Sequence, residues 1–316
     1  MYSIKSHSSC MLSIAAFLLS VSKCYTAPAT TSANNNSCIS STNDFDLHCS
    51  YLKSFDALNS VLSNLQENVV LMQISNLNWT HIPLNVFRNV SLNTLIISNS
   101  TFESFQNSST DLGLHHLSLE NVSFQTKPVW EDFEHLRNLQ TLSMYNVTLN
   151  STIDSSFCHS ISKSIKSVTI AAGNVSDIRP DSFRVLTSLT YLRISHNKLR
   201  TFPKLVLKNP SSLEHLRLDY NRIYSLPSGV FDNLSNLKVL SLSNNSISTL
   251  AEEVFSPVWR PDVHVELRDN PIKCDCKLQW AVTSSRKPLD IVGQCAHPKA
   301  LYGKQIKDLK AEDLSC

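Results

Sequence analysis

The sequence predicts a curved solenoid of the α/β class, with a parallel sheet on its concave face and disulfide-capped ends. About eight or nine coils of 22–26 residues are expected. Three observations lead to this prediction: apolar residues recur at fixed spacing over 69–261, most cysteines gather toward the two ends, and 42% of the residues are hydrophobic while only 17% are charged. Such a composition favours a packed core over disorder.

The repeat is clearest in the C-terminal half of the chain. One block places Leu237, Leu240, Leu242, Asn245, Ile247, Leu250 and Phe255 at offsets 0, 3, 5, 8, 10, 13 and 18. The blocks that begin at Leu213 and Leu189 repeat these offsets with a period of 24 residues. Looser blocks begin at 69, 92, 114, 139 and 165, and a further strand is expected at 265–267. A fixed period of this length indicates stacked structural repeats.

The spacing has a physical explanation. Residues at offsets 3 and 5 alternate as in a short strand, so both point to one face. The asparagine amide at offset 8 can satisfy backbone groups in the turn that follows. Residues at offsets 13 and 18 bring the chain back over the same core. Each coil is too thin to bury its own apolar stripe, so neighbouring coils must cover it.

The offset-8 position separates the two halves of the repeat array. It holds Asn197, Asn221, Asn245 and Asn270 in the C-terminal half. The equivalent positions upstream hold Leu77, Ser100, Val122, Val147 and Gly173. Apolar side chains cannot make the hydrogen bonds of an amide, so we expect less regular turns over 69–175.

The repeat resembles the leucine-rich-repeat pattern, and the segment that follows it resembles the C-terminal cap of extracellular proteins of that family. This segment reads N-P-I-K-C-D-C-K-L-Q-W from Asn270 to Trp280, followed by Cys295 and Cys316. The cysteines by themselves leave three connectivities open. The resemblance implies Cys274–Cys295 and Cys276–Cys316. A zinc site is the alternative, but the C-x-C spacing differs from the paired C-x₂-C of structural zinc.

The N-terminal end has fewer cysteines than many caps of this family. We predict a disulfide between Cys38 and Cys49, and a helix over 55–65 from the apolar spacing there. The expected organisation is an N-terminal cap over 38–68, repeats over 69–261, and the last strand with the cysteine-rich cap over 262–316.

The first residues are typical of a secretory signal. An apolar run from Met11 to Val21 follows a polar start, which predicts a signal peptide over 1–24 with cleavage somewhere in 22–29. Residues 25–37 are expected to form a disordered tail. No other stretch of about 20 apolar residues occurs, so no membrane insertion is expected. The expected location is secreted and extracellular.

Eleven N-x-S/T sequons support that location and predict N-linked glycans. The asparagines are Asn35, Asn78, Asn89, Asn99, Asn107, Asn121, Asn146, Asn150, Asn174, Asn233 and Asn244.

Charge and motifs exclude several function classes. Removing Lys5 and Lys23 with the signal peptide balances the remaining basic residues against 26 acidic ones, so no nucleic-acid partner is expected. The sequence has no G-x-S-x-G, phosphate-binding glycine loop or H-E-x-x-H. We therefore expect no enzyme activity, cofactor or metal. Cys158, the cysteine left unpaired, is expected to be inert and buried.

The concave face is the expected binding surface, because offsets 2, 4, 6 and 7 face solvent there. Aromatic and arginine side chains, the usual anchors of interfaces, gather on it in two coils. The predicted partner-binding residues are Tyr191, Arg193, His215, Arg217, Asp219 and Tyr220. Glycans on Asn99, Asn121, Asn146 and Asn244 would crowd the rim elsewhere and leave 191–220 open. The alternative is that these side chains form an ordinary solvated strand face.

The family resemblance implies recognition of a protein ligand or receptor. The segment from Ile74 to Val90, I-S-N-L-N-W-T-H-I-P-L-N-V-F-R-N-V, further resembles a set of arthropod proteins similar to the non-catalytic subunit of a shrimp luciferase. The alternative function is therefore a non-catalytic accessory subunit, or a matrix scaffold, that stabilises another secreted protein.

Overall fold

The computed structural model describes residues 37–40, 45–64, 69–106, 112–125, 130–149, 151–207 and 212–316. Residues 35–316 form one compact unit. The predicted signal peptide, most of the expected tail, and the sequon residues Asn35, Asn107 and Asn150 lie outside the described residues.

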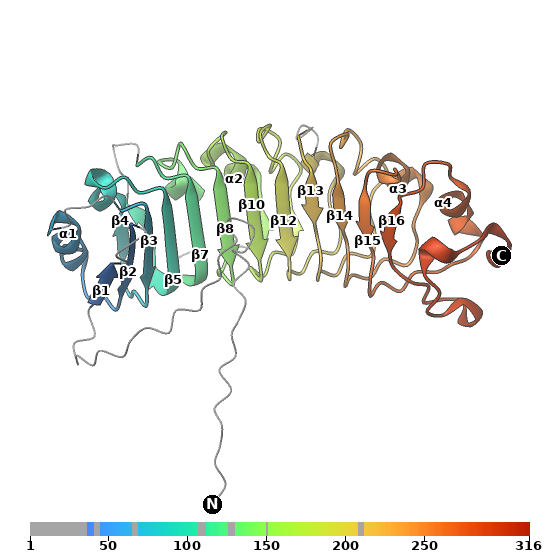
Figure 1. The fold of residues 1–316 in the computed structure, drawn as a ribbon, viewed down its shortest axis with the longest axis horizontal. Coiled ribbons are helices and arrows are strands. Elements are labelled where there is room, and N and C mark those ends of the chain that lie inside the picture. The colour runs from blue at the N-terminus through green and yellow to red at the C-terminus, as the bar shows by residue number, and fades with distance from the viewer. Residues whose placement is uncertain are drawn as a thin grey trace, which may run out of the picture. The chain divides into compact units, whose positions relative to one another are not determined.

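A twelve-stranded sheet runs the length of this unit, in the order β1-β2-β3-β5-β7-β8-β10-β12-β13-β14-β15-β16 (Figure 1). Its strands are β1 (Ser37–Ser40), β2 (Asp46–Ser50), β3 (Leu71–Ser75), β5 (Thr94–Phe102), β7 (His116–Phe124), β8 (Thr141–Tyr145), β10 (Ser167–Ala171), β12 (Tyr191–Ser195), β13 (His215–Arg217), β14 (Val239–Ser241), β15 (His264–Glu266) and β16 (Asp290–Val292). The predicted curved solenoid with a parallel sheet is confirmed.

The register of the sheet follows the sequence repeat. Leu192 pairs with Leu216, and Leu216 with Leu240, so each strand places the same repeat position beside its neighbour. All neighbouring strands are parallel except β1 and β2, which form an antiparallel pair. The parallel sheet extends one strand beyond the predicted coils at each end, through β2 and β16.

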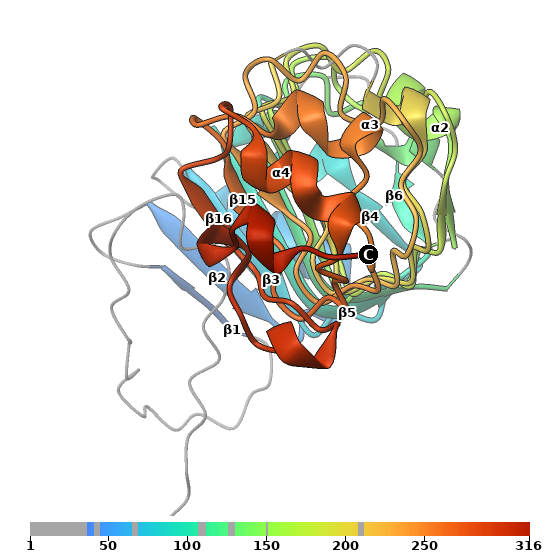
Figure 2. The same cartoon turned by 90° about the vertical axis from the view of Figure 1, so that its right-hand side faces the viewer.

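The opposite side of the solenoid carries turns, short helices and two small sheets, as Figure 2 shows in end view. The small sheets pair β4 (His81–Pro83) with β6 (Ser104–Gln106), and β9 (Thr152–Ile153) with β11 (Asp177–Ile178). The α-helices are α1 (Phe55–Asn64), α2 (Ser155–Ser160), α3 (Glu252–Phe255) and α4 (Gln279–Thr283). The 3₁₀ helices are η1 (Leu84–Asn89), η2 (Trp130–Phe133), η3 (Lys204–Leu207), η4 (Ser256–Val258), η5 (Cys276–Leu278), η6 (Lys299–Leu301), η7 (Ile306–Asp308) and η8 (Ala311–Asp313). Over the described ranges, no helix has both the length and the apolar character needed to cross a membrane.

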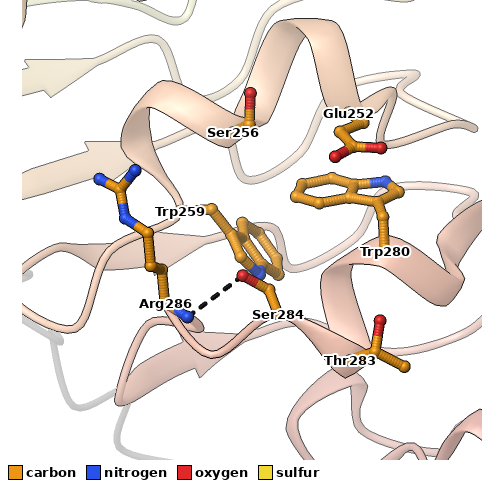
Figure 3. Close-up of a pocket in the computed structure, with 7 residues that line it drawn as sticks. All are labelled: Glu252, Ser256, Trp259, Trp280, Thr283, Ser284 and Arg286. Carbon is orange, nitrogen blue, oxygen red and sulfur yellow. Dashed lines mark hydrogen bonds between the residues drawn. The ribbon is translucent and has the colours of Figure 1, made fainter.

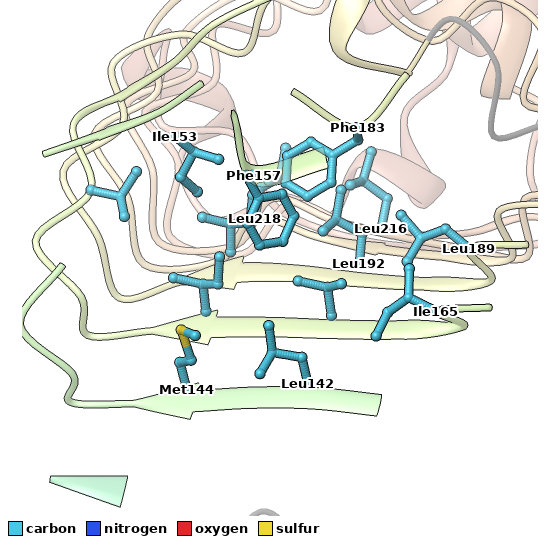
Figure 4. Packing of buried hydrophobic residues seen from close by; sticks show 14 of the residues in the cluster. Leu142, Met144, Ile153, Phe157, Ile165, Phe183, Leu189, Leu192, Leu216 and Leu218 are labelled. Atoms are coloured by element: carbon cyan, nitrogen blue, oxygen red, sulfur yellow. The ribbon is translucent and has the colours of Figure 1, made fainter. Parts of the chain in front are cut away.

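The core is one continuous apolar column inside the solenoid. Strand residues such as Leu192 and Leu216 are fully buried and point toward the phenylalanines of the outer segments (Figure 4). The rings of Phe157 and Phe183 lie 5.2 Å apart between successive coils, and those of Phe231 and Phe255 lie 5.8 Å apart. Because each coil covers the next, the stack needs a cap at either end.

Asparagines hold the turns together in the C-terminal half. We call Asn197, Asn221, Asn245 and Asn270 the asparagine ladder; all four are buried. The Asn221 amide accepts the backbone N–H of Leu199 at 3.1 Å and donates to the carbonyls of Ile194 and Leu218 at 2.8 and 3.0 Å. Each member of the ladder thus links its own turn to the coil before it.

The residue just before each offset-8 position has a left-handed backbone in every described coil. These residues are Tyr51, Asn76, Asn99, Asn121, Asn146, Ala172, His196, Tyr220, Asn244 and Asp269, with φ between 48° and 57°. Asparagine adopts this conformation more readily than most residues, which explains its frequency at this position. Four of these asparagines also begin sequons.

The N-terminal coils deviate in the way their offset-8 residues predict. Strands β5 and β7 run for nine residues each, past the point where the later strands end. Ser100 partly replaces the missing asparagine, because its hydroxyl accepts the N–H of Leu77 at 3.0 Å and donates to the carbonyl of Ser98 at 2.7 Å. Val122 and Val147 occupy offset 8 in the next two coils. Both are buried, and their apolar side chains make no hydrogen bond of this kind to the described residues.

Both ends of the solenoid are closed by disulfide-linked caps. Cys38 and Cys49 pair across β1 and β2. The C-terminal pairs are Cys274–Cys295 and Cys276–Cys316. The predicted helix of the N-terminal lid is confirmed as α1, which buries Leu58 and Leu62. The predicted disulfide-capped ends are therefore present.

Candidate functional site

The concave patch, defined as Tyr191, Arg193, His215, Arg217, Asp219 and Tyr220, lies on β12 and β13 and on the turn after β13. The register brings Tyr191 beside His215 and Arg193 beside Arg217. Their side chains are half-buried and point away from the core, since the residues between them are fully buried leucines. The structure thus brings four of the six predicted residues together on one surface.

Aromatic rings border the two arginines. The rings of Tyr191 and His215 lie 5.8 Å apart at an angle of 40°. Burial and the neighbouring Arg217 both lower the pKa of His215, which keeps this imidazole neutral near pH 7. Arg193 is held in place by a 2.7 Å hydrogen bond from its Nε to the Ser195 hydroxyl. The patch therefore presents two arginine side chains beside aromatic rings, and one of the two, Arg193, is held in place.

The prediction that Asp219 contacts a partner needs a correction. Asp219 is only 7% exposed, and its carboxylate contacts the Ser241 hydroxyl. The cause is the inward turn of the chain at offset 6, where Ser195 and Ser243 are also buried. Asp219 therefore leaves little surface for a partner to contact.

A polar chain continues from the patch toward the C-terminal cap. Glu266 accepts hydrogen bonds from the Ser241 hydroxyl at 2.9 Å and from His264 at 3.0 Å, and His264 also contacts Asp290. Burial alone would raise the pKa of Glu266, but the hydrogen bonds from His264 and Ser241, together with electrostatic attraction to His264 and Arg217, outweigh burial, so its pKa is lowered. Glu266 is therefore ionised at neutral pH.

A stacked pair of rings, which the sequence did not predict, lies at the rim of this sheet. The rings of His196 and Tyr220 lie 4.2 Å apart and within 15° of parallel. Both residues have the left-handed backbone of offset 7, which turns both side chains outward in the same way. Burial and Arg193 lower the pKa of His196, so the stacked imidazole is uncharged at neutral pH.

The sequon asparagines of the N-terminal coils form a line along the same rim. The Asn121 amide donates to Asn99 at 3.0 Å, and the Asn146 amide donates to Asn121 at 2.9 Å. All three are exposed, as are Asn78, Asn89, Asn174 and Asn233, whereas Asn244 is half-buried. Glycosylation of these asparagines stays a prediction.

A pocket of about 410 Å³ lies where the last coil meets the C-terminal cap (Figure 3). Its lining residues are Glu252, Ser256, Trp259, Trp280, Thr283, Ser284 and Arg286. Both indole N–H groups are used within the fold: Trp259 donates to the carbonyl of Ala281 and Trp280 to that of Leu250, at 3.0 and 2.9 Å. The two tryptophans therefore join the cap to the solenoid.

Other candidate groups are structural. Cys158 is buried and free, its sulfur lies 3.3 Å from the carbonyl oxygens of both Ser155 and Asp181, and burial raises its pKa. A raised pKa disfavours the reactive thiolate. Within the described parts of the chain, no cluster of three His, Cys, Asp or Glu residues could hold a metal ion.

Comparisons with known proteins agree with this architecture. A family profile described as leucine rich repeat matches residues 163–223 and 211–258. No curated protein sequence matches the chain. Human 5T4, also titled Wnt-activated inhibitory factor 1 and trophoblast glycoprotein, has a similar solved structure, with a TM-score of 0.55 over 88% of this chain and 98% of that chain at 19% identity.

At that identity the likeness concerns the fold. Leucine-rich repeats are a protein-interaction module, and the matched segments include both strands of the concave patch. The chain therefore contains leucine-rich repeats and folds as a disulfide-capped leucine-rich-repeat solenoid.

Proposed function

We propose that this chain is a secreted, extracellular, non-catalytic recognition module that binds a protein partner through the concave patch. The observation that carries the proposal is the pairing of Arg193 with Arg217 in register, bordered by the rings of Tyr191 and His215. Arginine and tyrosine are enriched among residues that dominate binding energy. Polar residues such as Ser143 and Thr169 occupy the same strand position in the preceding coils.

Secretion is part of the proposal and rests on the apolar run from Met11 to Val21, the three disulfides and the sequons. Expression in a eukaryotic secretory host tests it. We expect the chain in the medium, carrying N-linked glycans, with an N-terminus between residues 22 and 29. Retention of the intact N-terminus inside the cell would contradict this part of the proposal.

The binding surface is tested by affinity capture with the glycosylated chain, followed by mass spectrometry. We expect the variant Arg193→Ala/Arg217→Ala to lose most of the captured partner, because both cations lie at the centre of the patch. The matched control is Ser143→Ala/Thr169→Ala. These residues occupy the strand position of Arg193, two coils and one coil before it, respectively. Equal capture by both variants and the unmodified chain would remove this face as the binding surface.

A further inference from the structure

The loops that follow β12 and β13 lie in register just beyond the sheet. The backbone N–H of Lys198 donates to Val175 of the previous coil at 2.7 Å, and that of Arg222 donates to Leu199 at 2.8 Å. Further along, Tyr224 donates to the carbonyl of Arg200 at 3.2 Å. Equivalent residues of the two coils therefore lie side by side, about one strand spacing apart, or roughly 4.8 Å.

These paired positions form a surface that we call the rim strip. Its members are His196, Lys198, Arg200, Tyr220, Arg222 and Tyr224, and all six side chains are exposed. The stacked rings of His196 and Tyr220 lie at the sheet edge. Lys198 pairs with Arg222 at the next outward-facing position, and Arg200 with Tyr224 after that.

The cations of the rim strip are not neutralised by the molecule itself. Among the described residues, Lys198, Arg200 and Arg222 form no ion pair. By contrast, Lys238 is bound by Glu214 at 2.7 Å. The corresponding loop positions of the flanking coils hold only neutral residues, namely Asn174, Ser176, Ser246 and Ser248. Three unpaired cations thus project from two adjacent loops of a chain that is otherwise nearly balanced in charge.

Sequons frame the rim strip on both sides. Asn174 precedes Lys198 by one coil, and Asn244 follows Tyr220 by one coil. Glycans at these two positions would confine a ligand to the width of two coils, about 10 Å. A ligand that lies there is therefore slender and extended.

From this charge and shape we propose that the rim strip binds an extended acidic segment of a protein partner that also carries aromatic side chains. This inference rests on the proposed function. It adds the place where the partner leaves the concave face, and the chemistry of the partner segment that lies there. Carboxylates would pair with Lys198, Arg200 and Arg222, and a ring would pack against the His196–Tyr220 pair. Charge complementarity of this kind directs specificity and association.

A sulfated polysaccharide is the competing polyanion, and the arrangement favours the peptide. The cations do not form an unbroken run, because the position between Arg193 and Lys198 is taken by a pair of uncharged rings. A peptide can alternate acidic and aromatic side chains to match this order, since its side chains project at regular intervals along an extended backbone.

The test uses the full glycosylated chain and fluorescein-labelled peptides. The probe repeats Glu-Glu-Tyr-Tyr, so that each face of the extended peptide alternates carboxylates and rings; the comparison peptides repeat Gln-Gln-Tyr-Tyr and Glu-Glu-Ser-Ser. Fluorescence anisotropy measures binding at low and physiological salt. We expect the Glu-Glu-Tyr-Tyr peptide to bind more tightly than either comparison peptide, and Lys198→Glu/Arg222→Glu to weaken it by about tenfold or more.

The matched control, Lys163→Glu/Lys166→Glu, reverses the charge of two exposed lysines outside the rim strip and produces the same change in net charge. Equal weakening by the control pair would show unspecific attraction and overturn the proposal. The proposal would also be overturned if the chain bound a heparin-derived oligosaccharide but did not bind the acidic peptide. That result would assign the rim strip to a sulfated glycan. If partner capture depends on Arg193 and Arg217 but not on Lys198 and Arg222, the proposed function stands and this inference fails.

Discussion

The side-chain oxygen of Asn245 accepts the backbone N–H of Ile223 in the preceding coil at 2.9 Å. The same amide donates to the carbonyls of Leu218 and Leu242, each at 3.0 Å. One side chain therefore satisfies backbone groups of two coils at once. This relationship recurs along the asparagine ladder and gives the C-terminal half its regular turns.

We predict that Asn221→Ala lowers the free energy of unfolding by about 3 kcal/mol, because it leaves several buried backbone groups without partners. The affected groups include the N–H of Leu199 and the carbonyl of Ile194. Urea unfolding followed by circular dichroism measures the change. The control is Asn59→Ala on an exposed face of α1, which should have little effect. A midpoint unchanged in both variants would contradict the role given to the ladder.

The C-terminal cap leads to a second prediction. Removing the Cys274–Cys295 disulfide with Cys274→Ala/Cys295→Ala should cost about 3 kcal/mol, as expected for a loop of 21 residues. Because each coil contacts only its neighbours, the loss should be local. Hydrogen exchange should show reduced protection in 262–316 and the adjoining coils, with the N-terminal strands little changed. Uniform loss along the chain would contradict a local cap.

Most of the fold could be predicted from the sequence, because the apolar period fixes which residues enter the core. Leu216 and Leu240 occupy the same offset and prove to be register partners. The less regular N-terminal turns could be predicted in the same way, since the lack of an asparagine is visible in the sequence. The added strand β16 could not, because Asp290–Val292 lies in the cap, outside the repeat frame.

The site was predicted less completely. The spacing placed Tyr191 and His215 beside each other, but it gave no information on backbone conformation at offset 7. The left-handed φ of His196 and Tyr220 turns their rings together, and this depends on three-dimensional geometry. Strand alternation, extended two residues beyond β13, assigns Asp219 to the surface, but the chain has already turned inward there.

A third prediction follows from the lowered pKa of Glu266. A carboxyl whose pKa is lower in the folded state stabilises the fold above its unfolded pKa of about 4.3, and this contribution is lost as the pH falls through the folded pKa. Glu266→Gln should therefore destabilise the chain at neutral pH, and its difference from the unmodified chain should shrink at about pH 3. Thermal unfolding at both pH values measures this.

The control for that experiment is Glu253→Gln, which alters an exposed carboxyl in α3. It should give a small difference that varies little with pH. If Glu266→Gln shows the same destabilisation at both pH values, the loss is one of packing, and the ionised hydrogen bonds to His264 and Ser241 contribute nothing measurable.

The last prediction concerns Gly173, which occupies the asparagine position of its coil. The backbone N–H of Gly173 donates to the side-chain oxygen of Asn197 at 3.0 Å, so an asparagine of the next coil already satisfies this group. A Cβ at this position would lie 3.2 Å from Cδ1 of Leu149 and 3.4 Å from the carbonyl oxygen of Val147. Restoring the repeat consensus with Gly173→Asn should therefore destabilise the chain by about 1–3 kcal/mol through overpacking.

Gly173→Ala separates the two contributions to that loss. It adds only the Cβ, so it should cost less than Gly173→Asn, whose amide also needs space between Leu149 and the core. Urea midpoints of the two variants and the unmodified chain measure the order. If Gly173→Asn is instead the most stable of the three, the consensus asparagine fits this coil after local movement. Leu149 would then have to be displaced, because an added Cβ would lie 3.2 Å from its Cδ1, which is closer than ordinary van der Waals contact.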